Sequence, residues 1–186
     1  MTGFEFRPCF DLLHTAFSAQ ANIAKMRAPL DDPVMEGFVS QLEFINALAD
    51  ESPGFVWRLQ TDEGDATAIR AFDDERILFN MSAWESVEAL HQYVYRSRHA
   101  GPLRDRKQWF EPIDTHILVL WWIPAGHIPT VDEAKERFET LRKLGPTPEA
   151  FTFKQRFPPS MHLAAATQNV VSQVRIPTEE EAACLK

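Results

Sequence analysis

The feature that most constrains the fold of this chain is the order in which strand-like and helix-like segments follow one another. Residues 17–26 alternate between apolar and polar side chains, which is typical of a half-buried β-strand. Residues 55–60 and 77–84 also have strand character, and residues 116–123 form a last apolar strand-like segment. Two segments with helical spacing lie between them. The predicted order is strand, helix, strand, strand, helix, strand.

Capping residues indicate where these helices begin. Asp32 followed by Pro33 predicts the start of the first helix, and the turn residues 52–54 predict its end. Ser86 is predicted to cap the second helix, which we expect to be long and to continue toward Trp109. Apolar residues at helical spacing follow both caps.

This order of elements predicts an α+β fold, the ferredoxin-like βαββαβ arrangement with an antiparallel sheet and both helices on one face. The other face also needs a cover. We expect a second copy of the chain to provide it, so that two sheets close a dimeric α/β barrel. Thr130 and Glu133 form a capping box that predicts an added C-terminal helix outside this unit.

The length of 186 residues suits a single domain with extensions. We predict an N-terminal extension at residues 1–13, a domain at residues 14–160, and a tail at residues 161–186 whose small and acidic residues favour flexibility. The two cysteines, Cys9 and Cys184, fall in these extensions, so no disulfide framework is indicated. A reducing, cytoplasmic location is the expectation.

Charge and hydropathy exclude two classes of partner. Asp and Glu outnumber Lys and Arg by 27 to 19, and a negative protein repels the phosphate backbone of nucleic acids. The longest apolar run, residues 117–125, is far shorter than the roughly 20 residues that span a bilayer. We therefore expect neither nucleic acid nor a membrane as a partner.

Several short motifs carry a resemblance to a known family. They are residues 80–86 (Asn-Met-Ser-Ala-Trp-Glu-Ser), then Tyr95, Ser97 and His99, then residues 109–111, and finally residues 120–126. On these motifs the chain, from about residue 20 to residue 157, resembles the bacterial and fungal family known as domain of unknown function 3291, one of the dimeric α/β-barrel proteins. The block ending in Trp-Glu-Ser is shared more loosely with antibiotic-biosynthesis monooxygenases. The resemblance implies a homodimer around a cavity and no established catalytic residues.

Tryptophans and polar strand residues are the candidates for contact with a substrate. Neighbouring strand residues point to opposite faces, so one of Trp121 and Trp122 faces away from the helices. That side chain either lines an apolar pocket or packs in the dimer. Gln20 is a further polar residue that could face the same interior, and the alternative is that such residues face water at the sheet rim. The predicted substrate-binding residues are Asn22, Trp57, Ser82, Trp84, Trp109, Trp121 and Trp122.

A second group of residues carries the predicted catalytic roles. His91, Tyr95 and His99 recur every four residues on the second helix. His91 and His99 would stand about 12 Å apart along the helix axis, too far to share a metal ion. His99 alone could act as a general base, because imidazole titrates near neutral pH, but a lone helical histidine is more often a surface or hydrogen-bonded residue. The predicted catalytic residues are His99, Tyr95, Asn80 and Arg58.

Two classes of function are compatible with these features. The first is an enzyme of specialised (secondary) metabolism that encloses a hydrophobic, aromatic or polyketide-like molecule and oxygenates, cyclises, isomerises or dehydrates it with no cofactor and no metal. The second is a non-catalytic module for ligand binding or dimerisation. A third possibility, which the resemblance to this superfamily allows, is a haem-binding barrel.

Overall fold

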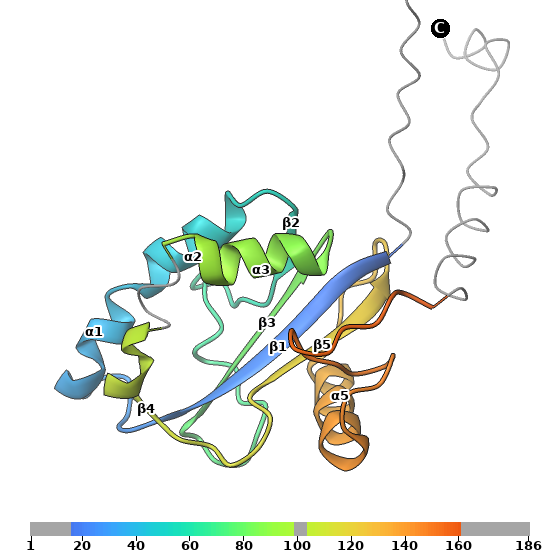
Figure 1. Ribbon diagram of the computed structural model, residues 1–186. Coiled ribbons are helices and arrows are strands. Elements are labelled where there is room, and N and C mark those ends of the chain that lie inside the picture. Colours follow the sequence, from blue (N-terminus) through green and yellow to red (C-terminus); the bar gives the residue numbers. More distant parts are fainter. Residues whose placement is uncertain (1–15, 99–103, 161–186) are drawn as a thin grey trace, which may run out of the picture.

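The computed structural model describes residues 16–98 and 104–160, and its centre is the long strand β1 (Ala16–Met26) (Figure 1). Along one edge β1 pairs antiparallel with β3 (Ile77–Trp84), which in turn pairs with β2 (Phe55–Arg58). Along its other edge β1 pairs antiparallel with β5 (Leu118–Pro124) and, near its end, with β4 (Phe110–Glu111). The described chain therefore forms one antiparallel sheet of five strands in an α+β fold, as expected.

The first predicted helix begins where its cap indicated but is divided into three pieces. The Asp32 carboxylate accepts a hydrogen bond from the Val34 N–H at 2.8 Å. The pieces are η1 (Pro33–Met35), α1 (Glu36–Val39) and α2 (Leu42–Asp50). Met35 packs with Trp109 in one apolar cluster, whereas α2 contributes Ala49 to another. Because its two ends pack in separate clusters, the segment from η1 to α2 bends between them.

The second predicted helix is shorter than expected. α3 (Val87–Arg96) begins at Ser86, whose hydroxyl accepts a hydrogen bond from the Ala89 N–H at 3.1 Å. It ends at Arg96, because Ser97 has an extended backbone with ψ −176°. The expectation that this helix continues toward Trp109 is therefore wrong. Trp109 instead follows the separate turn η2 (Arg106–Gln108).

Helices lie on both sides of the sheet (Figure 1). On one side α2 and α3 pack on Trp84 and Leu120. On the other side α5 (Val131–Leu144) buries Phe138 and other residues against the sheet. The assumption that helices of this chain cover only one face is therefore wrong, because the added helix covers the other. None of the helices in the described ranges is long and apolar enough to cross a bilayer.

Contact between α5 and the sheet can be tested through Phe138, which is 3% exposed. Phe138→Ala should lower the free energy of unfolding by about 3–5 kcal/mol, the usual cost of truncating a buried phenylalanine, as measured by urea denaturation. Leu144→Ala on the same helix is the matched control, because Leu144 is 72% exposed. Its effect should stay within about 0.5 kcal/mol. Similar small losses in both variants would contradict the packing of α5 on the sheet.

Candidate functional site

Polar side chains occupy the middle of the sheet face that α2 and α3 cover. Alternation along β1 and β3 puts Ser18, Gln20 and Asn22 on the same face as Ser82 and Asn80. The strand register brings these side chains close together, because Gln20 lies opposite Ser82 and Asn22 lies opposite Asn80. We call these five residues the polar strip.

The inner part of the polar strip is a buried hydrogen-bond network centred on Ser82. The Ser82 hydroxyl oxygen accepts hydrogen bonds from Gln20 Nε2 at 2.9 Å and from Trp84 Nε1 at 2.8 Å. Its two donors come from different strands, so the network joins β1 to β3 through side chains as well as through the backbone. The nearby Ser18 hydroxyl is also buried, and it has no hydrogen-bond partner.

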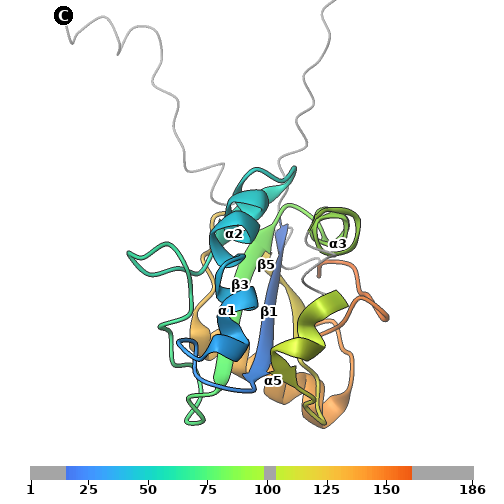
Figure 2. The same cartoon turned by 90° about the vertical axis from the view of Figure 1, so that its left-hand side faces the viewer.

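The outer part of the polar strip is accessible to solvent. Asn80 is exposed and Asn22 is partly exposed, although both lie on inner strands of the sheet. Within residues 16–98 and 104–160 neither carboxamide makes a side-chain hydrogen bond to the protein. In Figure 2, α1 and α2 are drawn in front of β3, and the yellow-green segment that contains η2 lies to the right of β1. Solvent therefore reaches both residues.

Arg58, predicted to be catalytic, lies beside the inner end of the strip and is held by protein contacts. It pairs with Ser82 in the strand register. Its Nε and Nη2 donate to the Asp50 carboxylate at 2.8 and 3.1 Å, and its Nη1 donates to the Gly64 carbonyl at 2.7 Å. This fork-shaped ion pair neutralises the guanidinium. Arg58 thus ties β2 to the end of α2.

Tyr93 closes the same end of the strip from above. Its hydroxyl donates to the Ile45 carbonyl at 3.1 Å, which joins α3 to α2. Burial, together with the negative charge of Asp50, raises the pKa of Tyr93 well above its ordinary value. The hydroxyl therefore stays neutral over the physiological pH range and acts as a donor in this contact.

Three of the predicted substrate-binding tryptophans are packed in the core. Trp84 stacks on Tyr93 with ring centroids 5.0 Å apart, so side chains fill the space between β3 and α3 at this row. Trp109 belongs to the cluster that Met35 and Phe38 share. Trp121 lies on the α5 side of the sheet and donates its indole N–H to Glu133 Oε1 at 2.8 Å.

The remaining aromatic candidates are more exposed and lie in different places. Trp122 is on the opposite face from Trp121, as predicted, and its Nε1 donates to the Phe157 carbonyl at 2.7 Å. Trp57 is partly buried at the margin of the cluster under α5. Tyr95 is 45% exposed, and its ring lies 4.7 Å from His91 on α3. His99 lies outside the described residues.

The structure thus brings together Asn22, Asn80 and Ser82 of the predicted set and adds Gln20 to them. Ser18 was not singled out from the sequence. Its signal was nevertheless present, because Ser18 stands on the polar side of the alternating segment that became the central strand.

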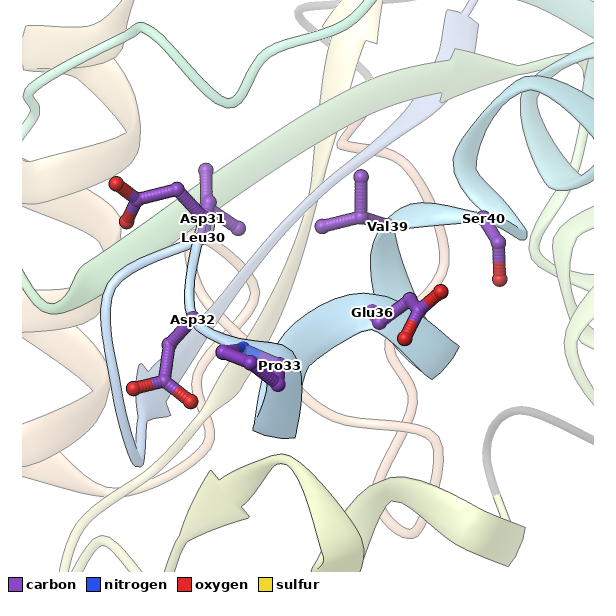
Figure 3. Close-up of a pocket in the computed structure, with 7 residues that line it drawn as sticks. All are labelled: Leu30, Asp31, Asp32, Pro33, Glu36, Val39 and Ser40. Carbon is purple, nitrogen blue, oxygen red and sulfur yellow. The ribbon is translucent and has the colours of Figure 1, made fainter.

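Two surface hollows lie away from the polar strip. One, of about 380 Å³, is formed by the loop before η1 and by α1 (Figure 3). Asp31, Asp32 and Glu36 line it, and Figure 3 shows their carboxylates pointing in different directions. In the ranges that the structure describes, no three His, Cys, Asp or Glu residues are grouped to hold a metal ion. The other hollow, of about 450 Å³, lies between α3 and the turn at Gly54.

The network around Ser82 predicts different effects for two similar substitutions on this face. Ser82→Ala leaves the buried donors of Gln20 and Trp84 without their acceptor and should lower the free energy of unfolding by about 2 kcal/mol or more. Ser18→Ala removes a buried hydroxyl that has no partner and should change it by less than about 0.5 kcal/mol, or raise it. Denaturant titration of both variants compares them directly. Equal losses in the free energy of unfolding would show that the two hydrogen bonds to Ser82 do not stabilise the fold.

Comparisons with known proteins place the chain in a family but do not assign an activity. No curated protein matches the sequence. Two solved structures are similar over 61% and 63% of this chain and 96% and 98% of their own, with TM-scores of 0.39 and sequence identities of 13% and 10%. They are PA3566 from Pseudomonas aeruginosa and NE2512, a protein of unknown function from Nitrosomonas europaea. Residues 18–167 match the family described as "Domain of unknown function (DUF3291)", and the chain belongs to this family.

Proposed function

We propose that this protein binds a small organic molecule on the polar strip, with a polar group of the ligand over Asn22 and Asn80. One observation carries the proposal. Two carboxamides lie directly opposite each other on inner strands, in reach of solvent, and neither has a side-chain hydrogen bond in the described part of the chain. Such groups are available to a ligand without the loss of an existing protein contact.

The two faces of the same strands support this proposal by their contrast. On the α5 side, β1 and β3 present Ala19, Ala21, Phe79, Met81 and Ala83, all of them buried and apolar. The other side is also covered by helices, yet it carries the polar strip. Polar groups between sheet and helices lower stability unless they are hydrogen-bonded. A role in binding explains why this face differs from the other.

Apolar clusters flank the strip at both ends and support a partly hydrophobic ligand. Trp84, Leu90 and Leu120 belong to the cluster at the inner end. Met26 and Trp109 belong to the cluster at the outer end. A ligand with apolar parts on either side of a hydrogen-bonding group matches this order. The hydrophobic small-molecule partner expected from the sequence is therefore retained as part of the proposal.

Catalysis at the same site would require a proton acceptor in addition to hydrogen-bonding groups. Carboxamides and hydroxyls can polarise a ligand carbonyl or stabilise a developing oxyanion, but they do not exchange protons near neutral pH. A cofactor-independent enzyme would need a proton acceptor, the role predicted for His99. Because the described strip supplies hydrogen bonds and no base, binding is the function that its geometry supports best.

Two finer features of the fold are proposed with it. The strand order β2-β3-β1 with β5 on the far edge of β1 supports the ferredoxin-like arrangement. Partly buried apolar residues at the margin of the α5 face, among them Phe17, Trp57 and Leu59, support a homodimer. Light scattering should then give about twice the chain mass of 21.3 kDa. A stable monomer at micromolar concentration would contradict the dimer. It would mean that α5 alone covers the apolar face of the sheet.

The binding proposal is tested by screening a fragment library with ¹⁵N-labelled protein and following the side-chain amide signals. Fragments that bind should shift the signals of Asn22 and Asn80. Asn80→Ala should then weaken their binding about fivefold to tenfold, the value of one or two neutral hydrogen bonds.

Asn46→Ala is the matched control, because its amide contacts the Gly64 carbonyl at 3.4 Å and is not part of the strip. It should leave the affinity unchanged, and circular dichroism checks that both variants fold. Fragments that keep their full affinity for Asn80→Ala and Asn22→Ala would place the binding site elsewhere on the protein.

A further inference from the structure

We infer that the polar group recognised by the strip is uncharged and carries both a hydrogen-bond donor and an acceptor, as an amide, a lactam or a hydroxy ketone does. The inference rests on the proposed function and specifies the ligand class for the same site. It follows from the charges that surround the strip and from the hydrogen bonds its side chains have already made.

Among the described residues, the side chains that β1, β3 and β5 present on this face of the sheet carry no charge. The residues that β1, β3 and β5 present there are Ala16, Ser18, Gln20, Asn22, Ala24 and Met26, then Leu78, Asn80, Ser82 and Trp84, then Leu118, Leu120, Trp122 and Pro124. None of these side chains is ionisable. Arg58 is the cation beside the strip, and both oxygens of Asp50 already hold it.

The lack of a countercharge on these strands therefore selects against an ionic ligand group. A carboxylate or an ammonium that exchanges water for the strip meets neutral amides and no opposite charge there. A neutral amide exchanges its hydrogen bonds to water for hydrogen bonds to Asn22 and Asn80 at little net cost. Lys25 offers no compensation, because it points to the opposite face and its Nζ lies 3.5 Å from Asp74.

The hydrogen bonds within the strip set the pattern of donors and acceptors. Gln20 uses its Nε2 on the Ser82 hydroxyl, so its Oε1 is the atom left to face a ligand. Gln20 is 7% exposed, and its Oε1 accepts no hydrogen bond in the described ranges. As an acceptor, Gln20 Oε1 pairs with an N–H or O–H donor on the ligand. The amide groups of Asn22 and Asn80 can donate to a ligand carbonyl next to that group.

Matched aromatic probes separate these requirements. Benzamide has the neutral donor and acceptor, benzoate replaces the donor with a charge, and N,N-dimethylbenzamide keeps the carbonyl without an N–H. Titration of ¹⁵N-labelled protein should show benzamide binding at the side-chain signals of Gln20, Asn22 and Asn80 with a millimolar Kd, as expected for a ligand of this size. The other two probes should bind at least roughly fivefold more weakly, the value of one lost hydrogen bond.

A variant that introduces a negative charge gives an independent comparison. Asn80→Asp is nearly isosteric at an exposed position, so folding should be preserved. Wild-type protein should prefer benzamide over the cation benzamidine, and Asn80→Asp should reverse this preference. Asp50 and Arg58 are unchanged in the variant, so the new charge is the only difference at the strip.

The outcomes distinguish the inference from the proposed function. If benzoate or benzamidine binds wild-type protein at the strip as tightly as benzamide, the neutral class is wrong but the strip remains a binding site. If N,N-dimethylbenzamide matches benzamide, the required donor is wrong. If none of the probes shifts the three amide signals, both the inference and the proposed function are overturned.

Discussion

The pairing of β1 with other strands along both of its edges is the constraint on which the rest of the structure depends. Because β3 lies on one edge and β5 and β4 on the other, the central strand cannot slip by one residue without exchanging its two faces. The register puts Ala21 opposite Met81 on one face and Asn22 opposite Asn80 on the other. From Ala19 to Ile23 one face of β1 is thereby apolar, and the other carries a row of amides.

That polar row is stable because most of its inner groups are paired. The Ser82 hydroxyl accepts two hydrogen bonds, and the Asp50 carboxylate neutralises Arg58. Only Ser18 is left buried and unpaired on this face among the described residues. The outer amides need no protein partner, since water reaches them. The strip therefore passes from a buried hydrogen-bond network at one end to solvent-accessible amides at the other.

Helix α5 covers the face of the sheet opposite the polar strip. Its carboxylate at Glu133 holds the buried indole of Trp121 and also contacts His127 Nε2 at 2.8 Å. An apolar face that would otherwise require a second chain is thus largely covered within one chain. The proposed homodimer uses residues at the margin of this face, and the proposed ligand site lies on the other side of the sheet.

Local features were determined by the sequence itself: β3 has the predicted bounds, and the caps at Asp32, Ser86 and Thr130 form as expected. These features depend on neighbours within a few residues, so their pattern is visible along the chain. The sequence also identified Asn22, Asn80 and Ser82 as candidates, because alternation assigns them to one side of their strands. Only the tertiary structure decided which side the helices cover and that α5 covers the other. It also decided that Trp84 is core and that Arg58 is held by Asp50. These outcomes depend on contacts between residues far apart in sequence, such as Gln20 and Ser82, which are 62 residues apart. Packing selects such contacts from many that local patterns allow equally.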